Sequence, residues 1–132
     1  MSSHLSYDRE TLSPQQESRT SGRLAITRTS CRGGTVIVRV TGEVDMTTAD
    51  QLDRQLGQLS ATKTIVDLEG TKFVAVAGVR ILLNAARRAQ ASRNVFAVAA
   101  ASPITARVLW LTAADAELAM YDTVLDAKRE LS

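Results

Sequence analysis

The alternation of apolar and polar side chains predicts where the ordered part of the chain begins. From Arg23 to Ser30 apolar and polar positions alternate, and the same period of two returns over residues 35–44. This spacing is typical of β-strands. The alternating positions are Leu24, Ile26 and Arg28 in the first stretch and Val36, Val38 and Val40 in the second. Between the two, Gly33 and Gly34 can adopt the positive φ angles of a tight turn, so we expect a β-hairpin.

The hydrophobic period changes to that of an α-helix beyond the second strand. Apolar residues recur three or four positions apart over residues 49–59 and again in the segment that follows Gly78. They are Ala49, Leu52, Leu56 and Leu59 in the first segment, and Leu82, Ala85, Ala86 and Ala89 in the second. We expect Thr47 to cap the first helix, with Asp50 favourably placed in its first turn.

Short apolar runs and a cap signal complete the order of elements. The runs predict strands over residues 64–68, 94–102 and 118–122, followed by a closing helix over residues 123–131. Ser102 as a cap and Pro103 at the first helical position predict a further helix that runs to about Leu111. Because strands alternate with helices, we expect an α/β fold with a mixed, mostly parallel sheet of five strands and about four helices.

Residues 1–21 lack this patterning. They are polar, contain few large apolar residues and show no periodicity, so they cannot bury enough surface to offset the entropy lost on ordering. We expect a flexible tail over residues 1–21 and one domain over residues 22–132. A regulated arm is the alternative for the tail, because the segment carries several serines and threonines.

The composition and charge exclude several functional classes. Of the 132 residues, 45% are hydrophobic and 4% aromatic, which suits an aliphatic core. A formal net charge of only +2, carried by scattered arginines, is a poor electrostatic footprint for nucleic acid. No apolar run approaches the ~20 residues of a membrane span, and the N-terminus lacks the pattern of a secretory signal. We therefore expect a cytoplasmic protein that binds neither nucleic acid nor membrane.

The sequence lacks the usual catalytic and metal-binding patterns. It holds no GxxxxGK[ST], GxGxxG, HExxH, CxxC or GxSxG motif, and its one histidine, His4, lies in the expected tail. The candidate acids are Asp45, Asp67 and Glu69, but Asp45 suits a helix N-terminus and Asp67 the end of a strand. The single cysteine, Cys31, excludes an internal disulfide; we expect an idle surface thiol, with a redox switch as the alternative. We expect no enzyme, no cofactor and no metal site.

Three segments carry a pattern known from one protein family. They are VTGEVDMTTADQL (residues 40–52), IVDLEGTKFVAVAGVRILL (residues 65–83) and SPITARVLWL (residues 102–111). The first resembles G-E-[LV]-D followed by T-A-x-x-L of the STAS-domain family, the anti-sigma-factor antagonists. The second resembles the family's apolar strand ending in D-L, then F-[IV]-D-S-[SA]-G-L and a helix, and the third its S-P-x-x-x-R-x-L-x-L helix. The resemblance covers roughly Leu24 to Leu131.

The resemblance implies a fold, a partner and a mode of control. Family members have a small mixed sheet packed on helices. The bacterial regulators among them bind an anti-sigma factor, commonly one with a histidine-kinase-like ATPase fold, and so release a sigma factor for transcription. Their binding is controlled by phosphorylation of a serine or threonine directly before the glycine that opens the second helix, where the added negative charge disrupts docking.

Carried onto this chain, the phosphoacceptor position is Ala77, followed by Gly78. The family's aspartate position is Ala75 and the intervening serine is Val76, so all three positions lack their polar group. Alanine has no oxygen to phosphorylate, and the segment resembles the unmodified, binding-competent form. Arg80 places a cation near apolar residues, as is common in interfaces. The residues expected to contact the partner are Asp45, Thr47, Thr48, Ala75, Val76, Ala77, Gly78 and Arg80.

Two other functional classes follow from the same residues. Loss of the phosphoacceptor at Ala77 also suits a ligand-sensing or scaffolding STAS module in a larger signalling assembly, because a domain freed from that switch can have changed its partner. An enzyme on a small α/β fold is the third class, and it rests only on Asp45 and Glu69. For residues 73–80 themselves, the alternative to an interface is a buried connector between strand and helix.

Overall fold

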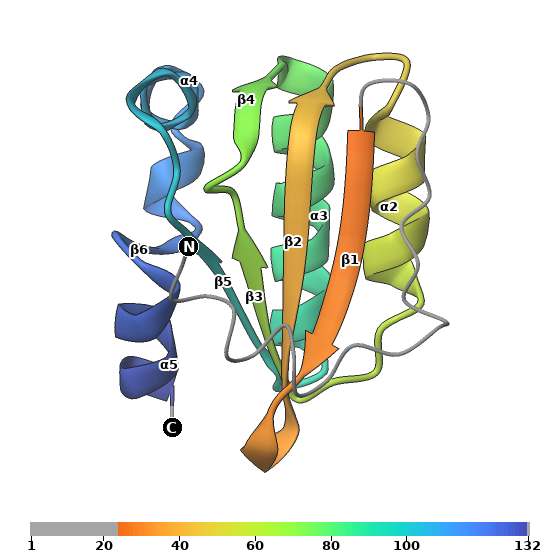
Figure 1. Ribbon diagram of the computed structural model, residues 1–132, viewed down its shortest axis with the longest axis vertical. Helices are drawn as coiled ribbons and strands as arrows, with labels where there is room; N and C mark the ends of the chain where they lie inside the picture. The colour runs from red at the N-terminus through yellow and green to blue at the C-terminus, as the bar shows by residue number, and fades with distance from the viewer. Residues whose placement is uncertain (1–23, 132) are drawn as a thin grey trace.

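The computed structural model describes residues 24–131, which form a six-stranded mixed sheet with helices packed against it (Figure 1). The strands are β1 (Leu24–Ser30), β2 (Thr35–Val44), β3 (Lys63–Asp67), β4 (Thr71–Val74), β5 (Val95–Ala99) and β6 (Ala119–Tyr121). The α-helices are α2 (Ala49–Gly57), α3 (Val76–Ala91), α4 (Pro103–Leu111) and α5 (Val124–Leu131). Short 3-10 turns are η2 (Arg32–Gly34) and η3 (Ala114–Ala116). The expected α/β class and the mostly parallel sheet are confirmed.

The predicted hairpin forms one edge of the sheet. β1 pairs antiparallel with β2, starting with Leu24 opposite Gly42. At the turn, Gly33 and Gly34 have φ angles of 81° and 83°, a conformation that side chains disfavour. All other pairings are parallel, and the strands follow the order β1-β2-β3-β5-β6, with β4 beside β2.

The sheet has six strands where five were expected, because local patterning does not reveal β4. This strand pairs with the last residues of β2, where β2 extends beyond the end of β3. The buried Thr71 hydroxyl fixes the start of β4 by donating to the Val40 carbonyl at 2.6 Å. Two of its four residues are apolar, and one of them, Phe73, is partly exposed. β4 therefore depends on the open edge of β2 rather than on its own sequence.

The start of α4 agrees with the prediction from the sequence, and the start of α3 differs from it. The Ser102 hydroxyl accepts the Thr105 N–H at 3.2 Å, and Pro103 is the first helical residue, as predicted. α3 begins at Val76, so that Gly78 lies within its first turn instead of preceding the helix. Alanine and valine before the glycine continue the helix, since neither has a side chain that competes for backbone hydrogen bonds.

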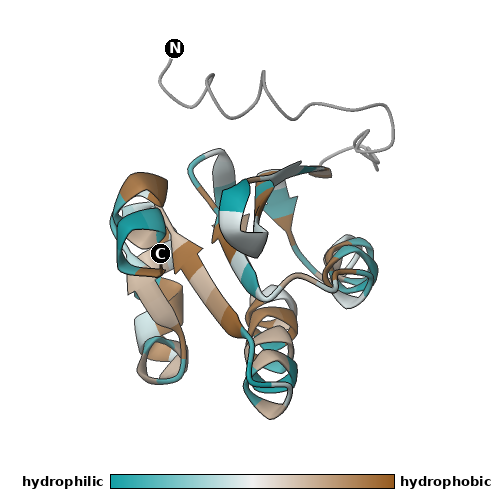
Figure 2. Cartoon of the chain, turned by 90° about the horizontal axis from the view of Figure 1, so that it is seen from below, coloured by the Kyte–Doolittle hydropathy of each residue, from teal (hydrophilic) through white to brown (hydrophobic). Residues whose placement is uncertain are grey.

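Helices cover the sheet on both faces, which explains the nearly continuous apolar runs of β3 and β5. One face packs on α2 and α3 around a larger core that includes Val38, Val66 and Val98. The other face packs on α5 in a smaller cluster that includes Ile37 and Ile65. Figure 2 shows the apolar central strands enclosed between these helices. The expected helix positions Leu52, Leu56, Leu82 and Ala85 are buried in the larger core, and Leu59, Ala86 and Ala89 pack half-buried against it.

Residues 1–23 and 132 are outside the described part of the chain. The expected tail over residues 1–21 and the boundary at residue 22 lie there. Within residues 24–131, no helix is long and apolar enough to cross a membrane, and no group of His, Cys, Asp or Glu side chains is large enough for a metal site. Cys31, expected at the surface, is half-buried against the smaller cluster.

Candidate partner-binding surface

Two strand-to-helix turns lie side by side at the edge where the parallel strands end (Figure 1). The polar turn, residues 45–48, joins β2 to α2. The apolar turn, residues 75–78, joins β4 to α3 and includes the first residues of that helix. The two are tied together by the Ala75 N–H, which donates to the Val44 carbonyl at 2.7 Å. The structure thus brings together both segments that were expected to contact a partner, and Arg80 follows one turn later in α3.

Side-chain hydrogen bonds hold the polar turn. The Asp45 carboxylate accepts the Thr47 N–H at 2.9 Å, the Thr47 hydroxyl at 2.7 Å and the Thr48 N–H at 3.2 Å. The Thr48 hydroxyl donates to the Glu43 carbonyl and accepts the Asp45 N–H, both at 2.9 Å. The predicted Thr47 cap is wrong, because Thr48 is the residue that flanks α2 and Asp45 is the residue whose side chain accepts. The Asp45 carboxylate, two residues before Thr47, accepts backbone N–H groups, which is the role that was expected of the Thr47 hydroxyl.

The residues of the polar turn differ in exposure. Thr48 is 1% exposed, so it fixes the turn and has almost no area to offer a partner. Thr47 is exposed and Asp45 half-buried. Met46 lies between them and is 79% exposed, although nothing in the sequence analysis singled it out. Its thioether side chain adds adaptable apolar area to this surface.

Backbone contacts alone hold the apolar turn. Ala75 precedes α3 with φ −82° and ψ 173°, the extended conformation of an N-cap, but its side chain cannot cap the helix. The Gly78 and Val79 N–H groups donate to the Ala75 carbonyl at 2.9 and 3.0 Å. The Val76 and Ala77 N–H groups have no acceptor within residues 24–131. Because Val76 is 57% exposed, the alternative of a buried connector does not hold for it.

Gly78 allows α3 to approach the sheet closely at the apolar turn. A β-carbon at this position would lie 2.5 Å from Cγ1 of Val44 and 2.9 Å from Cγ1 of Val74. These distances are below van der Waals contact, so a side chain here would displace the helix or the valines. The φ angle of Gly78 is not positive. Close approach, and not backbone conformation, is therefore the reason for glycine.

A second apolar surface adjoins the apolar turn on the side of α4. Ile104, Trp110 and Leu111 are large side chains of this helix, and each is at least 60% exposed. α4 packs beside β4, whose Phe73 is also exposed (Figure 1). Clusters of exposed large apolar residues commonly mark binding surfaces. The signal in the sequence is a helix that carries large apolar residues on more than one face instead of along one stripe.

Charged residues on the two sides of the apolar turn have opposite sign. Asp50 is exposed in the first turn of α2, next to the polar turn. On the other side, Lys72 of β4 and Arg107 of α4 are exposed. Arg80, expected to contact a partner, is exposed on α3. This separation of charge can orient a partner of complementary pattern on the surface.

Asp67, another candidate acid, has a role in stabilising the fold. Asp67 is the buried last residue of β3, with Oδ2 3.5 Å from the Arg39 Nε. Its Oδ1 accepts the Glu69 N–H at 3.0 Å. Pairing and hydrogen bonding are what a buried carboxylate requires for stability. Asp67 is thus explained by the fold, as Asp45 is explained by the polar turn.

The sequence matches a known family over most of the described chain. A family model with the description STAS domain matches residues 27–127. A curated relative, the anti-sigma-F factor antagonist RsfB of Mycobacterium tuberculosis, is 30% identical over 98 residues. That alignment covers 71% of this chain and 79% of the relative.

Solved structures with similar names share the fold. The anti-sigma factor antagonist from Mycobacterium paratuberculosis has a TM-score of 0.76 at 27% identity, and the match covers 85% of this chain and 97% of that one. The anti-sigma factor antagonist SpoIIAA in its unphosphorylated form has a TM-score of 0.69 at 22% identity, with coverage of 81% and 96%. At that identity, the likeness to SpoIIAA concerns the fold alone.

Proposed function

The chain belongs to the STAS domain family, and from this membership we propose that it is an anti-sigma-factor antagonist. It binds an anti-sigma factor and thereby frees a sigma factor for transcription in the cytoplasm. The proposed partner is an anti-sigma factor with a histidine-kinase-like ATPase fold. The name of the relative RsfB supports the proposal, since the alignment includes both turns of the candidate surface within a matched domain.

The observation that carries the proposal is the apolar turn. Val76 exposes more than half of its surface, and the neighbouring N–H groups of Val76 and Ala77 have no acceptor within the described chain. Burial of apolar surface against a partner contributes about 25 cal/mol per Å². A partner carbonyl or carboxylate would in addition satisfy the two N–H groups at the positive end of α3. Water can hydrogen-bond the N–H groups of a free helix start, whereas only a partner can bury Val76, because nothing else in residues 24–131 covers it.

The proposed interface extends from the polar turn to α4. A stable protein interface buries about 800 Å² on each partner, which is more than two short turns can provide. Met46, Phe73 and the exposed side chains of α4 continue the apolar area along the same edge of the domain. Arg80 and Asp50 supply charge at its sides. We therefore assign the exposed face of α4 to the same interface as the two turns.

Phosphorylation at the usual position cannot regulate this interface. Ala77 stands where the family has its phosphoacceptor, and it has no oxygen. A phosphate there would add about −1.5 to −2 charges next to the contact surface. Without it, the turn stays neutral in all conditions. Binding is then controlled by the amounts of the two proteins or by a competing partner.

Affinity capture from a lysate of the source organism tests the proposal. The full chain serves as bait beside two variants, Ala77→Asp at the apolar turn and Ala91→Asp at the exposed far end of α3. Captured anti-sigma factors are then purified and titrated, with the fluorescence of Trp110, the only tryptophan of the chain, as one readout. We expect a Kd of about 1 μM or lower for the parent chain and for Ala91→Asp, and at least about tenfold weaker binding for Ala77→Asp.

Two results would contradict this proposal. Failure of every ATPase-fold anti-sigma factor of the organism to bind at micromolar concentrations would remove the function. Equal affinities of Ala77→Asp and Ala91→Asp would leave the function but remove the apolar turn from the interface.

A further inference from the structure

The outer face of α4 combines large apolar side chains with a single charge. Its exposed residues are Pro103, Ile104, Arg107, Trp110 and Leu111. At about 100° per helical residue, these positions fall in one arc about 120° wide, and Arg107 is at its centre. The buried Thr105 and Leu109 lie on the opposite side of the helix. The exposed residues therefore form one continuous face with a guanidinium in the middle.

Arg107 makes no ion pair with any of residues 24–131, whereas Arg39, Arg87 and Arg88 each do. Water solvates this exposed guanidinium in the free protein. A partner that covers the apolar residues around it displaces that water and must supply hydrogen-bond acceptors in return. A carboxylate is the acceptor that matches a guanidinium best, since it accepts two parallel N–H bonds.

The strand beside α4 adds to the positive charge on this side of the domain. α4 packs next to β4 (Figure 1), where Lys72 is exposed and Phe73 is 42% exposed. Neither β4 nor α4 contains an Asp or Glu residue. Lys72, like Arg107, has no ion pair with the described residues. This side therefore favours an acidic surface over a basic one.

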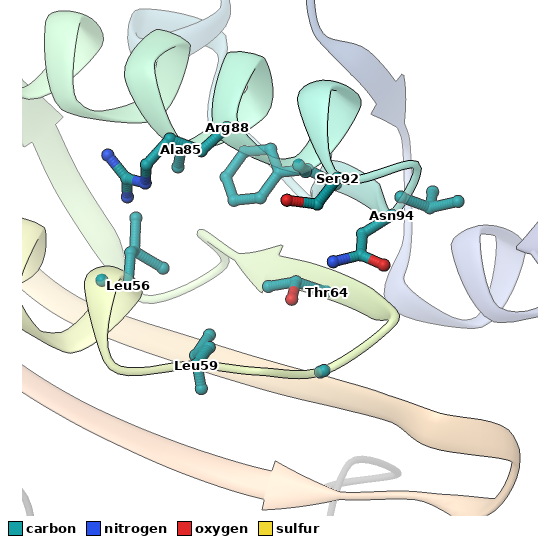
Figure 3. Close-up of a pocket in the computed structure, with 12 residues that line it drawn as sticks. Leu56, Leu59, Thr64, Ala85, Arg88, Ser92 and Asn94 are labelled. Atoms are coloured by element: carbon teal, nitrogen blue, oxygen red, sulfur yellow. The ribbon is translucent and has the colours of Figure 1, made fainter.

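The depression at the other end of the domain does not have this arrangement. It is an open hollow of about 230 Å³ between the ends of α2 and α3. Figure 3 shows its charged residue, Arg88, at the opposite end from Ser92 and Asn94. Arg88 also lies 4.0 Å from Asp53. Its polar groups do not converge, and its arginine already has a carboxylate nearby.

We propose that Arg107 binds a carboxylate of the anti-sigma factor at the centre of an apolar contact made by Ile104, Trp110 and Leu111. The inference rests on the proposed function, and it adds the chemistry of the partner surface, namely one Asp or Glu surrounded by large apolar side chains. Tryptophan and arginine are the residues that most often dominate the energy of an interface. The apolar contact excludes water from the ion pair, which strengthens the attraction between the two charges.

Calorimetric titration of the purified anti-sigma factor with the full chain tests the site. Arg107→Glu reverses the proposed anchor, and Arg54→Glu is the matched control. Arg54 is likewise exposed on a helix and without an ion pair among the described residues, but Asp50 and Gln58 flank it one turn away. We expect at least about thirtyfold weaker binding for Arg107→Glu. Arg54→Glu should stay within about twofold of the parent chain.

Two further measurements identify the contact. In the first, each exposed Asp and Glu of the anti-sigma factor is replaced by Arg, and one of these variants should restore the binding of Arg107→Glu by at least about tenfold. In the second, fluorinated tryptophan is incorporated into the chain, where Trp110 is the only tryptophan. Its fluorine NMR signal should shift when the anti-sigma factor is added. Thermal unfolding of each variant shows whether it is folded.

The outcomes separate this inference from the proposed function. Equal affinities of Arg107→Glu and Arg54→Glu, beside weaker binding of Ala77→Asp, would overturn the inference and leave the function standing. Failure of the parent chain to bind any anti-sigma factor would remove both. Association of the chain with itself, or binding to phosphatidylglycerol vesicles, would assign the face to a second copy or to a membrane if Arg107→Glu abolished it, and would overturn the partner named here.

Discussion

The polar and the apolar turn connect neighbouring strands to helices on the same edge of the sheet, but different forces hold them. In the polar turn, Asp45 and Thr48 each make several hydrogen bonds through their side chains. In the apolar turn no side chain makes a hydrogen bond within the described chain. The position of that turn is set by the Ala75 N–H bond to β2 and by the close approach of Gly78 to the sheet.

This difference separates the residues that carry the fold from those that carry the surface. Substitution of Asp45 or Thr48 removes hydrogen bonds that hold the conformation of its own turn. Val76 and Ala77 contribute little to the conformation of theirs, and their side chains can be chosen for a partner. The apolar turn is thus suited to an interface because the packing of Gly78, and not its side chains, positions it.

The largest expected change in stability comes from a substitution at Gly78, where the apolar turn packs against the sheet. Gly78→Ala places a β-carbon 2.5 Å from Cγ1 of Val44, and we expect it to lower the free energy of unfolding by about 2–3 kcal/mol. Gly57→Ala is the control, because nothing lies within 4 Å of a β-carbon there, and it should raise stability by about 0.5–1 kcal/mol. Urea denaturation measures both. Equal stabilities of the two variants would refute the account of Gly78.

The second-largest change in stability is expected from substitution of Asp45, the main hydrogen-bond acceptor of the polar turn. Asp45→Ala leaves the N–H groups of Thr47 and Thr48 without the carboxylate, which should cost about 1–2 kcal/mol of stability. Asp45→Asn keeps an oxygen at the same place and should recover at least half of the loss. Denaturant midpoints compare the three proteins. If Asn is as damaging as Ala, charge at the helix N-terminus, and not hydrogen bonding, holds the turn.

A substitution at Ala77 is expected to change partner affinity at the apolar turn without lowering the stability of the fold. Ala77→Asp should weaken partner binding about tenfold, or about 1.4 kcal/mol. Its stability should stay constant or rise by up to about 1 kcal/mol, because a carboxylate interacts favourably with the N-terminus of α3. Calorimetric titration and thermal unfolding of the same sample give both values. Parallel loss of stability and affinity would mean that the variant damages the fold and does not report on the interface.

The smallest effect makes the apolar turn resemble the polar one. Ala75→Ser adds a hydroxyl at a residue that already has the backbone conformation of an N-cap. We expect a gain of about 0.5–1 kcal/mol in the free energy of unfolding. Ala91→Ser, at the other end of the same helix, should lose about 0.5 kcal/mol. If both substitutions change the free energy of unfolding in the same direction, a side-chain cap at residue 75 does not stabilise the start of α3.

The locally encoded elements were the ones that the sequence predicted well. The hairpin at Gly33 and Gly34 and the start of α4 at Ser102 and Pro103 depend on backbone preferences of a few adjacent residues. The buried stripes of α2 and α3 depend on helical periodicity, which the sequence also records directly. For the same reason the α/β class could be assigned before any contact was known.

Long-range contacts decided the features that the sequence analysis missed. β4 exists because β2 extends beyond β3 and offers an open edge. Asp45, and not Thr47, accepts at the polar turn because the bend after β2 aims its carboxylate back at the chain. The exposure of Trp110 and Leu111 follows from the absence of any described element over the outer face of α4.

The sequence by itself determined the order and type of most elements and the family, and it predicts that Ala77 occupies the position of the family's phosphoacceptor. The tertiary structure alone decided that the two turns adjoin and that Gly78 serves close packing. The physical reason is that periodicity and turn preferences act between residues close in sequence. Surfaces and pockets, by contrast, are made by side chains from distant segments, whose meeting is fixed only when the sheet has formed.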